Sequence, residues 1–273
     1  MKRMNALFAL PLLIIAGVAM SGCDDKSSDP GETEWRMVWQ DEFDGDAGLP
    51  PDPDKWDHDV GTGWGNAQLE YDTDRTDNAA LDGEGNLVIT AREESYEGQP
   101  YTSARIVTRD LFERTYGRFE ARIRLPWGQG LWPAFWLLGA NIDSVGWPQC
   151  GEIDIMEYQG QNPATLHGSL HGPGYSGANA LTKTFRLVND RFDTGFHTFT
   201  VEWGEDSIRW FVDGIHYQTI MREDVPGEWV YNHPFYIILN VAVGGNWVGP
   251  PNAETEFPQR MLVDYVRVYE EVR

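Results

Sequence analysis

Three acidic residues stand close together in a short apolar stretch, at a spacing that could support acid–base chemistry. Glu152 and Asp154 are two residues apart, so both would lie on one face of a β-strand. Glu157 follows three residues later and would face the core of a regular strand, where an unpaired carboxylate is very costly. A β-bulge at residues 155–156 would add one residue and return Glu157 to the face of the other acids. The spacing therefore predicts three carboxylates along one face of one strand.

Clustered carboxylates repel one another, so at least one of them is expected to have a raised pKa. A protonated and an ionised carboxyl group form the pair that glycoside hydrolysis requires. A retaining hydrolase brings these groups to about 5–5.5 Å, whereas Cα atoms four positions apart on a straight strand are about 13 Å apart. The sheet must therefore curve and the side chains must lean inward. Spacing alone leaves two alternatives open, a solvated acidic strand and a calcium site built from carboxylates.

The segments around this stretch predict a domain built from β-strands. Residues 118–125 alternate polar and apolar side chains, the period of a half-buried strand. Asp213 and Gly214 separate two short apolar runs and favour a two-residue hairpin, and residues 82–86 form another turn. No long stretch keeps a helical period. We therefore predict an all-β sandwich of two antiparallel sheets over residues 35–273. Further strand-like runs occupy residues 87–91, 104–108, 196–203, 207–212, 235–243 and 262–269.

The composition fits such a domain and argues against one class of partner. The chain has 273 residues, with 43 Asp and Glu against 21 Lys and Arg, which gives a formal charge of −22. So acidic a protein would be repelled by DNA or RNA, and we expect no nucleic-acid partner. The 29 Gly and 16 Pro predict many turns, and the 12 Trp offer either core packing or aromatic surfaces.

The N-terminal residues are typical of a sorting signal. Residues 1–22 combine two basic residues near the start with a short apolar run, and they end in small residues directly before Cys23. This arrangement resembles a bacterial lipobox and predicts acylation of Cys23, with residues 23–34 as a flexible tether to the cell envelope. Ordinary signal-peptidase cleavage nearby, with Cys23 unmodified, is the alternative. In the mature chain Cys150 would be the remaining thiol, so no internal disulfide is expected.

The acidic stretch and several segments flanking it resemble glycoside hydrolase family 16. The resemblance implies a concanavalin-like β-jelly roll with a concave substrate cleft and a retaining mechanism. It assigns Glu152 as the nucleophile, Glu157 as the acid/base and Asp154 as the helper between them. The segments that carry the resemblance are residues 39–45, 63–66, 102–105, 116–120, 132–136, 152–157, 244–247 and 264–268.

The bulged form of the strand and residues 167–177 resemble the laminarinases within that family. The implied activity is endo-hydrolysis of β-1,3-glucan by a monomer, with no cofactor in the chemistry. Mixed-linkage glucan, agarose or carrageenan are alternative substrates, although an acidic protein suits sulfated polymers poorly. A non-catalytic glycan-binding module is a further alternative, but such a module has no need of three mutually repelling acids.

The resemblance also suggests which residues bind sugar. Aromatic rings bury the flat C–H faces of sugars well, and polar groups bond their hydroxyls. Core packing of Trp136, a surface salt bridge of Arg105 and a buried, satisfied His171 are the competing interpretations. Trp147 also lies in a matching segment. The residues assigned to substrate binding are Asn66, Arg105, Trp127, Trp132, Trp136, His171 and Trp247.

A structural calcium ion is the one metal that the resemblance implies. Its ligands in similar enzymes are an Asp side chain and backbone carbonyls on the convex face, and Asp264, Gly85 and Glu42 match those positions. The sequence has no Cys/His spacing typical of zinc and no phosphate-binding glycine loop followed by Lys.

Overall fold

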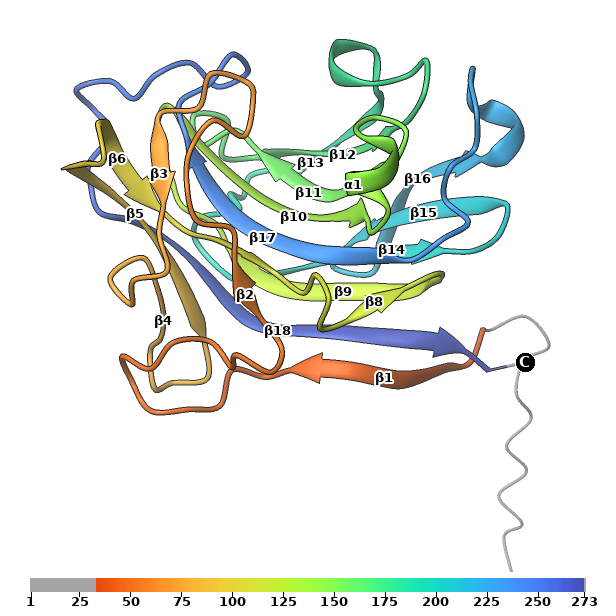
Figure 1. Ribbon diagram of the computed structural model, residues 1–273, viewed down its shortest axis with the longest axis horizontal. Helices are drawn as coiled ribbons and strands as arrows, with labels where there is room; N and C mark the ends of the chain where they lie inside the picture. Colours follow the sequence, from red (N-terminus) through yellow and green to blue (C-terminus); the bar gives the residue numbers. More distant parts are fainter. Residues whose placement is uncertain (1–32, 273) are drawn as a thin grey trace, which may run out of the picture. The chain divides into compact units, whose positions relative to one another are not determined.

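The computed structural model describes residues 33–272. The predicted signal peptide (residues 1–22), Cys23 and most of the predicted tether lie outside the described residues. Residues 34–272 form one compact unit of two stacked β-sheets, drawn in Figure 1. Within the described part of the chain, no helix is both long and apolar enough to cross a lipid bilayer.

The larger sheet lies on the opposite side of the sandwich from the acidic stretch. Its main path runs β16-β15-β14-β9-β18-β5-β6-β3, while β1 pairs with β18 and β4 pairs with β5. All of its pairings are antiparallel except that of β3 with β6, which is parallel and departs from the predicted pattern. The strands are β1 (Trp35–Asp41), β3 (Glu70–Asp72), β4 (Ala79–Leu81), β5 (Leu87–Tyr96), β6 (Gln99–Ser103), β9 (Gly117–Arg124), β14 (His197–Trp203), β15 (Ser207–Val212), β16 (Ile215–Met221) and β18 (Gln259–Glu271).

The smaller sheet carries the acidic stretch near its middle. Its path runs β13-β12-β11-β10-β17-β7-β2, and β8 pairs with β17. The strands β10, β11 and β17 curve along their length in Figure 1, which is the curvature that the acid spacing required. The strands are β2 (Asp57–His58), β7 (Arg105–Val107), β8 (Glu113–Arg114), β10 (Leu131–Gly139), β11 (Glu152–Tyr158), β12 (Thr165–His171), β13 (Leu181–Arg186) and β17 (Phe235–Val243).

The main hydrophobic core fills the space between the two sheets. In β9 the apolar residues predicted to alternate are all buried in that core. Asp213 and Gly214 have φ angles of 49° and 75° and join β15 to β16, as the hairpin pattern predicts. The prediction of an all-β two-sheet sandwich is therefore confirmed.

β17 departs from simple alternation because all nine of its residues are buried. Its inner side chains enter the main core, whereas Tyr236 and Ile238 form a second apolar cluster with Leu138 and Cys150. Ile142 packs against this second cluster, so both faces of the strand are covered at this end. The helical elements in the described residues are single turns, namely α1 (Ile142–Val145), η1 (Gly177–Asn179) and η2 (Arg222–Asp224).

Candidate active site

The acidic strand β11 contains the predicted bulge. Against β10, Asp154 pairs with Trp136 and Met156 pairs with Phe135, so Ile155 is the extra residue. The pairing with β12 shifts at the same place, between Asp154 and Glu157. The extra residue restores the phase of the strand, as the three-residue spacing predicts.

The bulged strand packs against the main hydrophobic core. Ile153, Ile155 and Met156 are buried between the sheets. Trp210 of β15 reaches across the core, and its indole Nε1–H donates to the main-chain carbonyl of Asp154 at 2.8 Å. A bulge disturbs the regular ladder of hydrogen bonds, so this contact fixes the strand where its own pairing is irregular.

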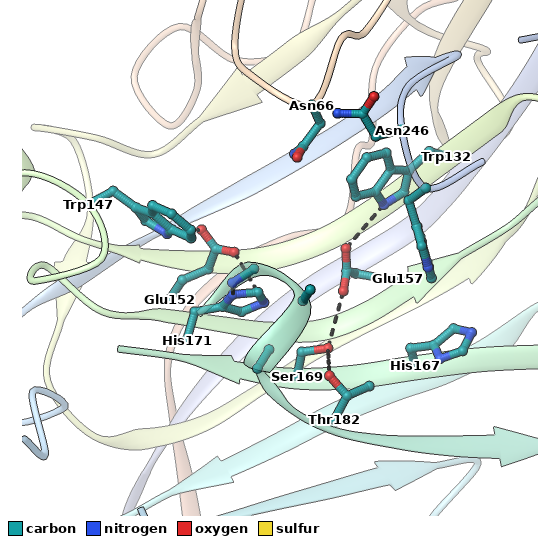
Figure 2. A pocket seen from close by; sticks show the side chains of 14 residues that line it. Asn66, Trp132, Trp147, Glu152, Glu157, His167, Ser169, His171, Thr182 and Asn246 are labelled. Atoms are coloured by element: carbon teal, nitrogen blue, oxygen red, sulfur yellow. Dashed lines mark hydrogen bonds and ion pairs between the residues drawn. The ribbon is translucent and has the colours of Figure 1, made fainter. Parts of the chain in front are cut away.

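The three acids lie beside a cavity of about 510 Å³, whose labelled side chains are shown in Figure 2. Glu152 and Glu157 line this cavity and are half-buried, whereas Asp154 is 3% exposed between them. A smaller cavity of about 90 Å³ adjoins it and is lined by all three acids. The residues lining both cavities are Asn66, Trp132, Glu152 and Glu157.

Glu152 has an indole on one side and an imidazole on the other. Trp147 Nε1–H donates to Glu152 Oε2 at 3.1 Å. His171 Nε2 lies 3.0 Å from Asp154 Oδ2 and 3.7 Å from Glu152 Oε1. The backbone N–H of Gly177 donates to His171 Nδ1 at 3.1 Å, so the neutral ring carries its proton on Nε2, between the two acids. His171 Nε2 is therefore in close ion-pair contact with Asp154, although Asp154 Oδ2 accepts no hydrogen bond among the described residues.

The same hydrogen bond bears on metal binding. One ligand atom from each of Glu152, Asp154 and His171 lies within 4.8 Å of the others, a separation that a metal ion can bridge. A histidine that binds a metal normally donates its other ring N–H to an acceptor. Here the other ring nitrogen accepts the Gly177 N–H instead. This donor set does not suit a resident metal, and the calcium alternative for the acidic strand is disfavoured.

Glu157 has a different set of partners. Trp132 Nε1–H donates to Glu157 Oε1 at 3.1 Å, and Ser169 Oγ–H donates to Oε2 at 3.3 Å. Thr182 Oγ1 in turn donates to Ser169 Oγ at 2.9 Å. The ring of Trp247 packs edge-on against Trp132 with centroids 5.0 Å apart. Glu157 is thus held from two sides, with an aromatic wall beside it.

Burial raises the pKa of each acid to about 8. For Glu152 and Glu157 the negative charge of Asp154 raises the pKa further, whereas His171 and the donated hydrogen bonds lower it. Three such groups cannot ionise together near neutral pH. A proton on Asp154 would remove the charge between the two glutamates, so that one of them could ionise while the other stays protonated.

Aromatic and polar groups extend the site beyond the acids, along the smaller cavity. The Arg105 guanidinium lies 4.9 Å from the ring of Trp64 and 4.8 Å from that of Trp136. Arg105 also forms an ion pair with Asp59 at 2.9 Å. Asn66 lies across from these groups in a left-handed backbone conformation, with φ at 55°. Arg105 therefore forms a salt bridge and also lines the site, and Trp136 is held by a hydrogen bond to Asn240 and also lines the site.

Trp127 lies apart from the other predicted sugar-binding residues, and its assignment stays a prediction. Its ring is 42% exposed and lies against the guanidinium of Arg191 at 5.3 Å, and its backbone N–H donates to Gln259. It lines neither of the two cavities at the acids.

Several lining residues were not assigned from the sequence. Trp64 and Ser169 fall inside motifs that carry the family resemblance, so the motif itself was the available signal. Asn240 accepts the Trp136 Nε1–H at 2.8 Å and is the single polar residue in the apolar run of β17. A lone polar residue in a fully buried strand was the signal for it.

The residues expected to hold calcium lie together beside β18. The strands next to Glu42 and Gly85 both pair with β18 within two residues of Asp264. The Asp264 carboxylate, however, forms an ion pair with Arg122, and Arg267 donates to both carboxylate oxygens of Glu42 at 2.8 Å. A calcium ion at Asp264 would therefore have to displace Arg122.

Comparison with known proteins supports one family. The model of glycosyl hydrolases family 16 matches residues 64–267. The chain is 45% identical over 283 aligned residues to a β-glucanase of Rhodothermus marinus, covering 98% of this chain and 96% of that protein.

Solved structures agree in fold and sequence. The laminarinase catalytic domain of Thermotoga maritima has a TM-score of 0.83 and 46% identity, covering 88% of this chain and 100% of that one. The endo-β-1,3-glucanase of Pyrococcus furiosus has the same TM-score and identity, covering 88% of this chain and 96% of that one. With three carboxylates on one face of a bulged, curved strand and a family match over most of its length, the chain belongs to glycoside hydrolase family 16.

Proposed function

We propose that this protein hydrolyses β-1,3-glucan internally and with retention of anomeric configuration. The observation that carries the proposal is the placement of Glu152 and Glu157, on the same face of the bulged strand, at one aromatic-walled cavity. The similarity to a laminarinase and an endo-β-1,3-glucanase supports this choice of substrate.

In the proposed mechanism the two glutamates act in sequence. Glu157 protonates the departing glycosidic oxygen while Glu152 attacks the anomeric carbon and forms a glycosyl-enzyme. Glu157, now ionised, then takes a proton from water, which displaces Glu152. Asp154 positions Glu152 and tunes its charge, since the charge of Asp154 raises the pKa of Glu152 and that of His171 lowers it. These steps need only side chains and water.

The walls of the site suit a neutral, flexible glucan. Trp132, Trp147 and Trp247 present ring faces or edges around the acids, and these can bury sugar C–H surfaces. A chain with a formal charge of −22 repels sulfated polymers at long range. Mixed-linkage glucan and galactans remain alternative substrates of the same mechanism, and a glycan-binding role without catalysis is the alternative of another class.

Product analysis on a glycan panel tests the proposal. Residues 24–273 would be incubated with laminarin, mixed-linkage β-glucan, agarose and carrageenan, with the Glu152→Gln variant as the matched control. We expect oligosaccharides of several lengths from laminarin at early times, with the β-anomer appearing first by NMR. Initial release of the α-anomer would exclude retention. Binding of laminarin without sugar release by the wild type would favour the glycan-binding role.

We further propose that Cys23 carries a lipid that anchors the enzyme, as a monomer, to the bacterial cell envelope. The support is the sequence pattern of residues 1–22 before Cys23. Wild type and Cys23→Ala would be expressed with their signal and fractionated after labelling with a clickable fatty acid. We expect label and membrane association for the wild type alone. Equal release of both proteins into the soluble fraction would exclude lipidation.

We also propose a structural calcium ion held by Asp264 and the backbone carbonyls of Glu42 and Gly85. Its support is the resemblance together with the adjacency of these segments beside β18. Calcium would stabilise the folded state because it binds the folded chain and not the unfolded chain. We expect added Ca²⁺ to raise the melting temperature of the wild type and not that of Asp264→Ala. An unchanged wild-type melting curve with chelator and with calcium would contradict the proposal.

A further inference from the structure

One end of the site is a layered wall whose central member is a guanidinium. Arg105 lies between the rings of Trp64 and Trp136, at 4.9 and 4.8 Å. All three side chains line the smaller cavity together with the three acids. A sugar that extends from the acids toward this end would therefore meet the wall.

Each member of the wall is fixed by one polar partner. Trp136 Nε1–H donates to Asn240 on the neighbouring strand β17, and Arg105 pairs with Asp59. These two members lie on strands of the smaller sheet. Trp64 lies in the loop before β3, outside any strand, and its ring is 37% exposed. Its position therefore depends on what the loop is attached to.

The loop of Trp64 is attached to β3, and chiefly to Asp72. Trp64 Nε1–H donates to Asp72 Oδ2 at 2.8 Å. The backbones of Gly61 and Asp72 exchange two hydrogen bonds, at 2.9 and 2.7 Å, and Thr62 Oγ1 donates to the carbonyl of Glu70. The backbone contacts hold the base of the loop, whereas the ring itself is held by its hydrogen bond to Asp72 and by its packing against Arg105.

Asp72 is an unusual choice for a structural acceptor. Its side chain is 2% exposed, the acidic Glu70 lies two residues away, and its Oδ1 has no hydrogen-bond partner among the described residues. A carboxyl group in such surroundings is costly. Asp72 lines neither cavity, so it cannot touch a bound sugar in this arrangement. Its one side-chain hydrogen bond within the described residues goes to Trp64.

We propose that Asp72 is a positioning residue, which holds the Trp64 ring as the outer layer of the wall and thereby sets glucan affinity at that end of the site. The inference rests on the proposed function for the identity of the ligand. Asp72 takes no part in bond cleavage, so its loss should weaken substrate binding and leave the chemical step unchanged. A residue needed only for folding would instead lower stability without a selective effect on KM.

The test is a double-variant cycle on the hydrogen bond between Trp64 and Asp72. Trp64→Phe removes the indole N–H donor and keeps an aromatic ring, and Asp72→Ala removes the carboxyl acceptor. Each change should raise KM for laminarin about 3–10-fold with kcat within about twofold, since one hydrogen bond to a carboxyl group is lost. The double variant should be no worse than the poorer single variant. Asp72→Asn keeps an acceptor and should restore KM to near the wild-type value.

Binding measured without turnover separates failure of this inference from failure of the proposed function. Each change would be placed in the Glu152→Gln background and titrated with a β-1,3-linked glucose hexamer by calorimetry. Absence of binding in that background alone would count against the proposed substrate. Wild-type affinity in Trp64→Phe and Asp72→Ala, or additive losses in the double variant, would overturn the positioning role. If Asp72→Ala does not fold, wild-type affinity in Trp64→Phe still overturns the positioning role, because that change lies on an exposed ring.

Discussion

Two groups of buried carboxyls lie in this domain, the three acids of β11 and the pair Glu70 and Asp72 on β3. In both groups burial raises the pKa, to about 8 for each of the three acids and to about 7 for Glu70, and well above its usual range for Asp72. By pKa alone the two groups would be equal candidates for a catalytic site.

Their surroundings distinguish them. Glu70 Oε2 accepts the backbone N–H of Val243 at 2.7 Å, and the nearby charge of Arg105 lowers the pKa of both members of the pair. Glu70 and Asp72 line neither cavity. Glu152 and Glu157 line both cavities, and Asp154 lines the smaller one. A raised pKa therefore reports burial, and access to a cavity decides whether the group can reach a substrate.

The largest expected effect separates the two groups by activity. Glu152→Gln should lower kcat/KM on laminarin by at least about 1,000-fold, because the variant has no nucleophile. Glu70→Gln should stay within about threefold at pH 6, because a buried, largely protonated carboxyl resembles the neutral amide. Initial rates of both variants, with circular dichroism to confirm folding, would check this. Comparable losses in the two variants would remove the distinction drawn between the groups.

The second effect concerns stability as a function of pH. The folded-state pKa of Glu70, about 7, lies above its ordinary value of 4.5, so the folded state binds the proton more tightly. The resulting stabilisation is complete below about pH 4.5 and is lost as pH rises through about 7. Glu70→Gln cannot ionise and should melt about 2–6 °C above the wild type at pH 8, with little difference at pH 5.

Melting curves across this pH range provide the measurement. The three acids of β11 produce a loss of the same sign up to about pH 8, so Glu152→Gln should also flatten the profile. A wild-type melting temperature that rises between pH 5 and pH 8, after correction for buffer, would show that burial does not raise these pKa values.

The smallest effect refines the role of Glu157. Ser169 donates a hydrogen bond to Glu157 and thereby lowers its pKa. Ser169→Ala should raise that pKa, moving the basic limb of kcat/KM upward by less than about one pH unit and lowering kcat a few-fold. A Ser144→Ala control, on α1 and lining neither cavity, should leave the profile unchanged. A downward move of the basic limb would contradict the assignment of Glu157 as the acid.

Much of the fold was predictable because it depends on local patterns. The alternation in β9 and the Asp-Gly hairpin gave correct strands and a correct turn, since strand period and turn chemistry are local properties. β17 was predictable as a strand, but the covering of both its faces depends on the second apolar cluster around Tyr236 and Ile238. Such a cluster joins residues that are far apart in sequence.

The site was predictable in part for the same reason. The three-residue spacing from Asp154 to Glu157 requires a phase shift, and the bulge at Ile155 provides it. The position of Trp127 outside both cavities was not predictable, because a turn beside a matching motif does not show which way the chain leaves it. Asp72 was missed because nothing in its neighbourhood in the sequence shows that it meets the indole of Trp64.

The sequence by itself determined the strand that carries the acids, the phase shift within it and the family to which these motifs belong. Side-chain types and their period along the chain are enough for those conclusions. Only the tertiary structure decided which buried acids reach a cavity, which tautomer His171 adopts and which carboxyl holds Trp64 in place. These features depend on where loops and turns return in space, which side-chain period does not specify: Gly177 meets His171 from the turn after β12, and the loop of Trp64 folds back onto β3.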